Sequence, residues 1–479
     1  MLDVVIIGCG IVGAAAAYEL SRYDLTVAVT ERENDVAMGA TKANSAVIHA
    51  GYDPWPGTLM ARLNVEGAQL ATQLFKKLDI PYRQCGSFVL AFSKKEIEDL
   101  DRQLDKARKN SVPDVSILPG DELLKMEPNL SKDVVAALYA PTTMIVDPWE
   151  YTLALAETSV RNGVQIYLER AVSGIERIRD GYRLHTTGGD METRRVLNAA
   201  GVYSDVIHNM VSKPAFKIQP AKGEYCLLDK SEGARVNSVI FQCPSRSGKG
   251  VLVLPTVHGN LIVGPSSESP TSMDDVATTA DGLDFVFETA RKSVPGIDFG
   301  AKIRSFSGIR ARSDRRDFII EEAEPGFFDL AGIKSPGLSA SPAIAKMAVR
   351  LMKNSGLVLI EKREFFDSRK RIRSRGLTKD EKSDLVRSDP SYGRVVCRCE
   401  TVTEGEVRDA LNGPLPPRSI DAVKRRCGAG MGRCQGGFCG PRVLEILAKH
   451  YQLDPVEVLQ DREGTNVLVS ETKTANALY

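Results

Sequence analysis

Three glycines near the start of the chain have the spacing of a nucleotide-binding turn. Gly8, Gly10 and Gly13 form the pattern G-x-G-x-x-G between an apolar run and an alanine-rich segment, which predict a buried strand and a helix. The first glycine allows the tight turn, the second leaves space for a pyrophosphate, and the third lets helix and strand pack closely. A second apolar run ends at Glu31, close to the spacing of about 20 residues expected for the acid that holds a ribose hydroxyl. Together these features predict a dinucleotide site.

Five cysteines near the C-terminus could bind a metal. Cys397 and Cys399 form one pair and Cys434 and Cys439 a second, while Cys427 lies outside both pairs. In a reducing compartment four thiolates can hold zinc or an iron–sulfur cluster. The C-x-C spacing fits structural zinc poorly, and glycines around the second pair would bring N–H groups near cluster sulfurs. The pattern favours a [2Fe–2S] cluster, with zinc as the alternative. Basic residues nearby would either offset the charge of a cluster or form a solvated face: Lys424, Arg425, Arg426 and Arg433.

The number of electrons carried by each centre connects the two ends of the chain. An iron–sulfur cluster moves one electron at a time, whereas oxidation of an alcohol or amine by hydride transfer removes two. A nicotinamide does not readily divide that pair, but a flavin does. A nucleotide-binding unit and one cluster in a single chain therefore favour FAD over NAD.

Three further side chains are candidates for contact with a substrate. His49 lies in residues 39–52, whose small side chains would let a planar ring approach the backbone; a tightly packed loop is the alternative. Arg310 follows a glycine and would be a bidentate partner for carboxylate or phosphate, with a surface arginine as the alternative. Lys334 lies before a helix start whose N–H groups could stabilise negative charge on a ligand. His258 is expected to be a solvated turn histidine.

The elements that must position these residues alternate between helix and strand, and the region from residue 218 to about 307 is rich in strands. Such a region predicts an antiparallel sheet that forms a second, substrate-binding domain. We expect helices at about 64–78, 94–109, 148–161, 342–353, 378–386, 404–411 and 419–425. We expect strands at about 81–91, 163–168, 171–175, 195–201, 224–228, 251–255, 260–264 and 328–332.

The composition excludes several classes of partner. The chain has 479 residues, 43% apolar and 26% charged, with a net charge of +1. That balance gives no reason to propose nucleic acid or an anionic membrane as partner. The first apolar run is too short to span a bilayer, and no basic leader precedes it. The expected location is the cytoplasm, with peripheral membrane association only through partners.

The motifs resemble two known families. The glycine fingerprint, residues 44–51 and residues 332–342 resemble the D-amino-acid-oxidase-like FAD superfamily over residues 1 to about 350. The tail, from Cys397 to Cys439, is similar to the bacterioferritin-associated-ferredoxin-like [2Fe–2S] domain. The combination resembles the A subunit of anaerobic glycerol-3-phosphate dehydrogenases and its shorter relatives, and residues 49–59 also resemble L-2-hydroxyglutarate dehydrogenases. Glycerol-3-phosphate dehydrogenases typically carry an Arg-Tyr pair shortly after the histidine, where this chain has Asp53-Pro54.

The resemblance implies an α/β and α+β fold. A Rossmann-like FAD-binding domain would be interleaved with an antiparallel substrate domain, and a small helical [2Fe–2S] domain would follow. The oxidoreductase would cover residues 1–364, with FAD-binding parts at about 1–78, 142–215 and 308–358 and substrate-domain parts at about 79–141 and 216–307. The rest would be a linker at 365–392, the cluster domain at 393–460 and a tail at 461–479.

The resemblance also assigns residues to each site. The catalytic candidates are His49, Arg310 and Lys334, and the cluster ligands are Cys397, Cys399, Cys434 and Cys439. The residues expected to contact FAD are Gly8, Gly10, Ile11, Val12, Gly13, Glu31, Arg32, Thr41, Asn44, Ser45, Val172, Ala200, Gly201, Gly332, Gly337 and Leu338.

The leading hypothesis is a FAD-dependent dehydrogenase that oxidises the secondary alcohol of a small anion, first glycerol 3-phosphate and second a 2-hydroxy acid. Arg310, with Arg312 as a second candidate, would bind the anion, and His49 or Lys334 would take the hydroxyl proton. His49 could instead pack on the flavin or be joined to it covalently, as in some relatives. Electrons would leave singly to a partner subunit or carrier. The alternatives are oxidation of a secondary amine such as proline or sarcosine, and a pure electron-transfer subunit.

Overall fold

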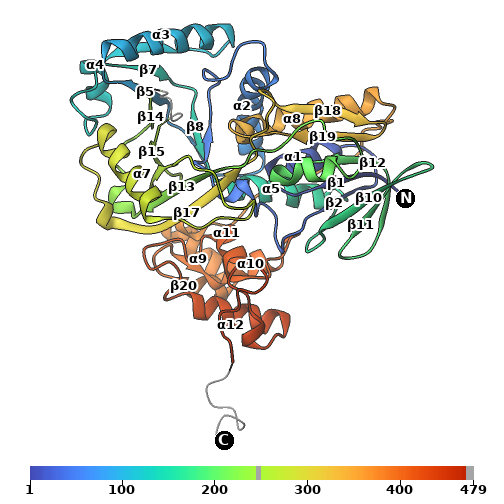
Figure 1. The fold of residues 1–479 in the computed structure, drawn as a ribbon. Coiled ribbons are helices and arrows are strands. Elements are labelled where there is room, and N and C mark those ends of the chain that lie inside the picture. The colour runs from blue at the N-terminus through green and yellow to red at the C-terminus, as the bar shows by residue number, and fades with distance from the viewer. Residues whose placement is uncertain (244–249, 471–479) are drawn as a thin grey trace, which may run out of the picture. The chain divides into compact units, whose positions relative to one another are not determined.

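The computed structural model describes residues 1–243 and 250–470, which form two compact units (Figure 1). The first unit comprises residues 1–32 and 36–369. The second comprises residues 33–35 and the chain from Lys370 onward.

The first sheet of the first unit has the parallel core expected for a nucleotide-binding fold. Strand β1 lies between β12 and β2, and all three run parallel. The four residues from Val4 to Ile7 are all apolar and all buried. Continuous apolar runs of this kind are typical of parallel strands that are covered by helices on both faces. In spatial order the strands are β10 (Val172–Ile178), β11 (Gly181–Thr186), β12 (Met191–Asn198), β1 (Leu2–Ile7), β2 (Val27–Thr30) and β9 (Gln165–Tyr167), with β19 (Phe327–Ala331) beside β12 and β18 (Ile319–Glu324) beside β19.

The helices of this part of the unit pack on one another through small residues. Helix α1 contacts both α5 and α8, and α8 also contacts α2. The alanines at positions 14–17 of α1 are all buried, so neighbouring helices approach closely. The helices are α1 (Ile11–Leu20), α2 (Leu59–Lys77), α5 (Pro148–Arg161), α6 (Ser204–His208) and α8 (Gly337–Asn354).

The second sheet contains the strands expected between residues 218 and 307. Its neighbours pair antiparallel except β14 and β5, which are parallel. Its strands are, in order, β17 (Lys302–Arg310), β13 (Ala221–Leu228), β16 (Leu261–Gly264), β15 (Leu252–Pro255), β14 (Val239–Gln242), β5 (Ser87–Ala91), β7 (Ala136–Ala140) and β6 (Ser116–Pro119). The helices α3 (Lys94–Lys109), α4 (Gly120–Met126) and α7 (Ala280–Ser293) accompany it.

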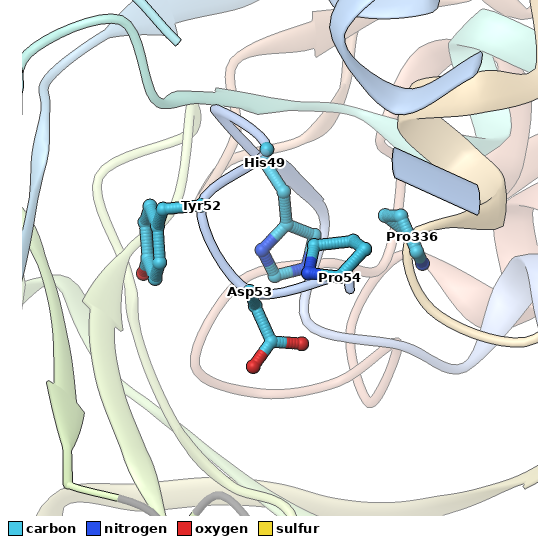
Figure 2. Close-up of a pocket in the computed structure, with 6 residues that line it drawn as sticks. His49, Tyr52, Asp53, Pro54 and Pro336 are labelled. Carbon is cyan, nitrogen blue, oxygen red and sulfur yellow. The ribbon is translucent and has the colours of Figure 1, made fainter. Parts of the chain in front are cut away.

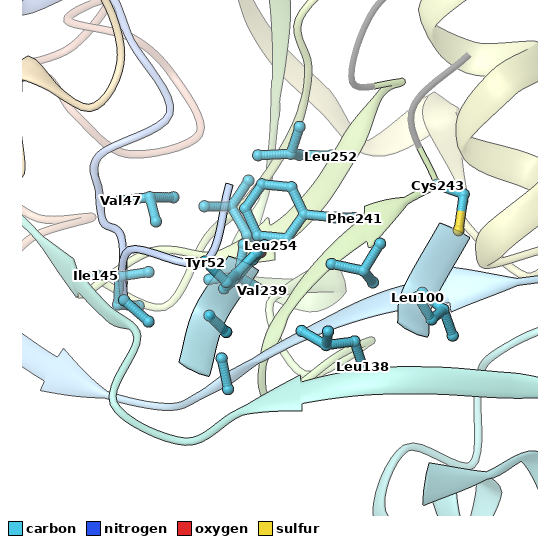
Figure 3. Close-up of a cluster of buried hydrophobic side chains, with 14 of the residues drawn as sticks. Val47, Tyr52, Leu100, Leu138, Ile145, Val239, Phe241, Cys243, Leu252 and Leu254 are labelled. Atoms are coloured by element: carbon cyan, nitrogen blue, oxygen red, sulfur yellow. The ribbon is translucent and has the colours of Figure 1, made fainter. Parts of the chain in front are cut away.

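A hydrophobic cluster fills one face of this sheet (Figure 3). Tyr52 and Phe241 lie within it, 6.4 Å apart between ring centroids and edge to face. Leu138 and Val239 are fully buried in the same cluster. Burial of each such side chain contributes about 1.5–3 kcal/mol, so this core holds the loop that carries Tyr52 against the sheet.

The strand expected at residues 81–91 is wrong as a single element. The structure has β4 (Tyr82–Gln84) in a three-stranded sheet with β3 (Val47–Ile48) and β8 (Met144–Val146), whereas β5 belongs to the eight-stranded sheet. The chain turns between them at Gly86, whose φ is +70°. That backbone conformation suits glycine and breaks the extended run.

The second unit is mainly helical. Residues Val407, Val423, Val443 and Leu447 come from three helices and form its core. The elements are α9 (Lys379–Ser388), β20 (Val395–Cys397), β21 (Val402–Thr403), α10 (Glu404–Leu411), α11 (Ile420–Cys427) and α12 (Gly440–Tyr451). Short 3₁₀ turns in the two units are η1 (Ala40–Lys42), η2 (Gly201–Tyr203), η3 (Lys230–Glu232), η4 (Phe299–Ala301), η5 (Ser374–Gly376), η6 (Pro390–Gly393) and η7 (Pro455–Glu457). Nowhere in the described residues is there a helix with the length and apolarity needed to cross a membrane.

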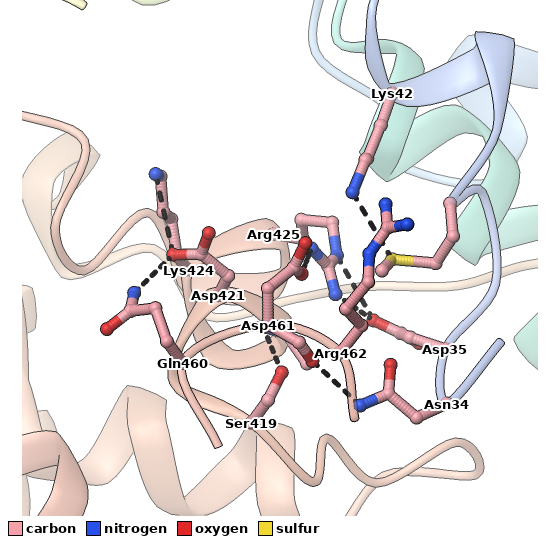
Figure 4. Close-up of polar contacts among 12 residues, drawn as sticks. Asn34, Asp35, Lys42, Ser419, Asp421, Lys424, Arg425, Gln460, Asp461 and Arg462 are labelled. Carbon is pink, nitrogen blue, oxygen red and sulfur yellow. Dashed lines mark hydrogen bonds and ion pairs between the residues drawn. The ribbon is translucent and has the colours of Figure 1, made fainter. Parts of the chain in front are cut away.

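The basic run at the end of α11 is not a solvated face. Lys424, Arg425 and Arg426 are buried, whereas Arg433 is exposed. Lys424 pairs with Asp421, and Arg425 pairs with Asp35 and Asp461 (Figure 4). Arg426 also pairs with Asp35. Their charge is therefore matched by aspartates, because a buried cation is tolerated only when it is paired.

Candidate functional site

The glycine fingerprint forms the expected strand–turn–helix. Gly8 has φ +96°, and a Cβ there would lie 2.7 Å from the Ala199 carbonyl oxygen. A Cβ on Gly13 would lie 2.0 Å from the carbonyl oxygen of Gly8. Both positions therefore exclude larger residues. The turn packs directly against the end of β12, which brings Ala200 and Gly201 beside it.

Two side chains hold this turn in place. The Glu31 carboxylate accepts a hydrogen bond from the Cys9 amide at 2.7 Å, and Thr41 Oγ1 accepts one from the Ile11 amide at 3.0 Å. Glu31 is thus beside the glycine turn, where a ribose would be bound. The Glu31 carbonyl accepts from the Arg170 amide at 2.8 Å, so the start of β10 at Val172 follows closely along the chain. Arg32 is instead paired with Asp274 at 2.7 Å.

The loop from η1 to β3 is shaped by Asn44. Its side-chain amide donates to the Thr41 carbonyl at 2.8 Å, and its Oδ1 accepts from the Ala46 amide at 2.7 Å. These bonds stabilise a compact turn in which Ser45 is half-buried and Ala46 has φ +58°. The turn leads directly into β3 and His49.

His49 is held where three segments of the first unit meet. Its amide donates to Ser339 Oγ at 2.8 Å, and its Nε2 lies 3.2 Å from Ser335 Oγ. Its ring lies 5.9 Å from that of Phe241 between centroids. The histidine therefore joins the β3 loop, the start of α8 and the eight-stranded sheet. Figure 2 shows that it lines a small cleft, whose other lining residues are Gly51, Tyr52, Asp53, Pro54 and Pro336.

Arg310 ends β17 and is half-buried. Its Nη2 donates to the Ser266 carbonyl at 3.0 Å. A Cβ on Gly308 would lie 1.9 Å from the Ala43 carbonyl oxygen, so β17 passes directly against the loop that leads to His49. The neighbouring Arg312 is exposed. Arg310 is therefore not a simple surface arginine.

The other predicted site residues lie in the segment before α8 and in its first turn. Gly332 has φ +64°, and the Lys334 carbonyl accepts from the Gly337 amide at 2.6 Å. Lys334 is half-buried. Helix α8 begins at Gly337 without a side-chain cap, and the Leu338 carbonyl accepts from Ser341 Oγ at 3.1 Å. The start of a helix can stabilise negative charge on a ligand through its dipole.

Sequence reasoning missed a buried polar network that joins two parallel strands. Asp329 on β19 contacts His208 Nδ1 at 2.6 Å and accepts from the Asn198 side chain on β12 at 2.7 Å. Burial raises the pKa of Asp329. His208 Nε2 lies 3.1 Å from the Lys213 carbonyl oxygen. Asparagine and aspartate within otherwise apolar strands were the signal that could have found this network.

His258 lies in a turn and is exposed, as expected for a solvated turn histidine. Its side chain is 42% exposed, and its Nε2 lies 2.8 Å from Asp147 Oδ2. The other oxygen of Asp147 accepts from the first amides of α5. The exposed ring therefore also contacts a helix cap.

The cysteines of the second unit converge as two close pairs. Cys399 Sγ lies 3.8 Å from Cys434 Sγ. A hydrogen bond with the Cys439 thiol lowers the pKa of Cys397 to about 6. Two thiol pairs suit a cluster in which two irons share four cysteines.

Cys427 takes no part in this group. Its Sγ donates to the Val423 carbonyl at 3.3 Å, one helical turn back. Burial raises the pKa of the Cys427 thiol to about 11. Cys427 thus bonds to its own helix, whereas the other four thiols contact one another in pairs.

Comparison with known proteins identifies both units. Residues 3–351 match the family described as FAD dependent oxidoreductase, and residues 395–449 match the BFD-like [2Fe-2S] binding domain. The chain belongs to the FAD-dependent oxidoreductases. It is 48% identical to a glycerol 3-phosphate dehydrogenase of Caloramator mitchellensis over 99% of each chain. It is 35% identical to the glycerol 3-phosphate oxidase of Mycoplasma genitalium, over 73% of this chain and 94% of that protein.

A solved structure shows the same fold with its cofactor. The L-alpha-glycerophosphate oxidase of Mycoplasma pneumoniae, with FAD bound, aligns with a TM-score of 0.74 and 32% identity. The alignment covers 77% of this chain and 98% of that protein. This FAD-dependent oxidoreductase therefore has the fold class and both cofactors that the sequence motifs predict.

The residues of the first unit fit FAD. The turn at Gly8 would take the pyrophosphate at the start of α1, and Glu31 would take the ribose. The flavin end would lie along the small residues of the Asn44 loop and the start of α8. When bound there, FAD supplies a two-electron acceptor that can pass on single electrons.

Loss of one cluster cysteine should separate ligands from bystanders. We expect Cys397→Ser to abolish most of the bound iron and sulfide, because a cluster needs all four thiolates. The matched variant Cys427→Ser keeps the hydrogen bond to Val423 and should keep the cluster. Iron and sulfide content and visible absorbance of the purified protein measure both. Equal loss in the two variants would contradict the ligand assignment.

Proposed function

We propose that this oxidoreductase oxidises glycerol 3-phosphate to dihydroxyacetone phosphate and passes the electrons singly, through its [2Fe–2S] cluster, to a partner or carrier. Similarity to a glycerol 3-phosphate dehydrogenase over nearly the whole of both chains carries this choice of substrate. The similarity spans both units of this chain.

The geometry of the cleft supports a secondary alcohol as the reacting group. His49 lines the cleft, and Ser335 Oγ lies 3.2 Å from its Nε2. We assign His49 as the base that accepts the hydroxyl proton while the carbon-bound hydrogen leaves with the electron pair. Ser335 would orient the imidazole, and the Phe241 ring packs close to it and limits its movement. Lys334 remains the alternative base.

Arg310 is assigned to the phosphate. One N–H of its guanidinium is bound by the Ser266 carbonyl, which leaves other donors for a bidentate contact. Asp53 lines the cleft on the side of His49, where a phosphate would be repelled by the carboxylate (Figure 2). The phosphate would therefore lie toward Arg310 and the alcohol toward His49.

Anaerobic reduction of the bound flavin tests the substrate. We expect glycerol 3-phosphate to bleach the flavin absorbance of the purified chain within one turnover, whereas L-2-hydroxyglutarate, proline and sarcosine leave it unchanged. Bleaching by L-2-hydroxyglutarate alone would replace the substrate by a 2-hydroxy acid. Bleaching by proline or sarcosine would make the substrate a secondary amine, and no bleaching by any of these compounds would leave an electron-transfer subunit.

The role of Arg310 is tested by its replacement. We expect Arg310→Met to raise the KM for glycerol 3-phosphate by about 10- to 100-fold, because hydrogen bonds to charged groups contribute about 1.5–3 kcal/mol and 1.4 kcal/mol is tenfold. Arg312→Met is the matched control, since Arg312 is exposed two residues away. Steady-state kinetics measure both. An equal rise in KM in the Arg312→Met variant would place the phosphate elsewhere.

A further inference from the structure

Two facing glycines interrupt the side chains on one face of the eight-stranded sheet. Strands β13 and β17 are neighbours (Figure 1), and Gly223 pairs directly with Gly308. On the same face Ala221 pairs with Arg310. On the other side of the glycines Tyr225 and Phe306 stack with ring centroids 5.0 Å apart. The face thus has a gap one residue wide between an arginine and an aromatic pair.

The Arg310 guanidinium occupies this gap. A Cβ on Gly223 would lie 2.1 Å from Arg310 Nη2 and 3.1 Å from its Cζ, so the Nη2 end of the guanidinium lies where a side chain of residue 223 would be. The Ser266 carbonyl then accepts from the same Nη2 at 3.0 Å. The absence of a side chain at Gly223 and the presence of this carbonyl together set where the guanidinium lies.

Gly223 is not required for the conformation of its own backbone. It lies inside a regular antiparallel ladder, and its φ is outside the left-handed region that favours glycine. An alanine could adopt the same backbone conformation. Its methyl group would collide with Arg310 and, at 2.8 Å, with Pro265 Cβ. A β-branched residue at this position would stabilise the ladder more than glycine does. The glycine therefore makes room for the side chains that lie over it.

We propose that Gly223 is a positioning residue for substrate recognition: by leaving space over β13 it places the Arg310 guanidinium at the reach and orientation needed to bind the phosphate. The inference rests on the assignment of Arg310 to phosphate in the proposed function. A methyl group at Gly223 leaves the charge of Arg310 unchanged but displaces the planar fork, and bidentate contacts depend on that geometry.

A double-mutant cycle on the full-length holoenzyme tests the inference. We expect Gly223→Ala to raise the KM for glycerol 3-phosphate by about 10-fold or more, with kcat changed by less than about 3-fold, because ground-state anchoring is lost while the reacting groups are untouched. In an Arg310→Met background the same substitution should change the KM by less than about 2-fold, since the two residues act as one. Gly296→Ala is the control, as a Cβ there meets only Arg235 Nη1 at 3.6 Å.

The outcomes separate this inference from the proposed function. If Arg310→Met raises the KM but Gly223→Ala does not, only the role of Gly223 fails. If Arg310→Met itself leaves the KM unchanged, the phosphate assignment fails. Effects that multiply in the double variant would show that Gly223 acts through the fold rather than through Arg310, which overturns the inference. Should Gly223→Ala not fold, recovery of folding in Gly223→Ala/Arg310→Met supports the contact, and failure of both contradicts it.

Discussion

Replacement of His49 by glutamine is expected to lower kcat for glycerol 3-phosphate by about 10²- to 10⁴-fold, the usual contribution of a general base. Glutamine retains a polar group of similar length near Ser335 but cannot accept a proton at neutral pH. The His49 backbone contacts with Ser339 and Asn64 would persist, so the cleft should keep its shape. Stopped-flow reduction of the flavin under anaerobic conditions measures the step directly.

The control for this variant is His185→Gln. His185 lies on β11, is 45% exposed and contacts Asp190, so its loss should leave turnover unchanged. A His49→Gln variant that keeps more than about a tenth of wild-type kcat would transfer the role of base to Lys334. Release of yellow colour on acid precipitation of the wild-type protein would exclude a covalent bond between His49 and the flavin.

Removal of the Asp35 charge is expected to destabilise the second unit by about 3–5 kcal/mol, as for other buried ion pairs that lose one partner. Asp35 contacts Arg425 at 3.0 Å (Figure 4). It also contacts Arg426 at 2.9 Å, and its side chain is 2% exposed. Asp35→Asn keeps the shape but leaves two buried guanidiniums without this carboxylate. Thermal unfolding followed by loss of cluster absorbance measures the effect.

The matched variant is Asp461→Asn, because Asp461 is 20% exposed and contacts Arg425 at 2.7 Å. It should cost about 1 kcal/mol, in the range of a partly exposed pair. If the two variants lose equal stability, the burial of the carboxylate does not determine how much each ion pair stabilises the second unit.

The ion pairs of Asp35 also predict how the stability of the second unit depends on pH. Burial opposes ionisation of Asp35, but Arg426 and Arg425 outweigh it and lower the pKa of Asp35 below its usual value of 3.8. A lowered pKa in the folded state means that the stabilisation is complete above the ordinary pKa and is lost as the pH falls through the folded value. The difference in stability between wild type and the Asp35→Asn variant should therefore be constant at neutral pH and shrink below about pH 4.

Local patterns determined most elements of the fold. The helices at residues 94–109 and 404–411 have the bounds that their charge and apolar periodicity predict, since Ser93 and Thr403 cap their first turns. Helix α12 was missed although Pro441 and the spacing of Val443, Leu444 and Leu447 indicate it.

By itself, the sequence determined the nucleotide fold, the iron–sulfur domain and the candidate residues, because glycine spacing, apolar runs and cysteine pairs act over short stretches of chain. The tertiary structure alone decided the partner of each polar side chain. Arg425 and Arg426 meet Asp35 across some 390 residues, and Arg310 lies over Gly223 through strand register. Such pairings depend on long-range packing, and a charged residue carries no local mark of the residue that will neutralise or position it.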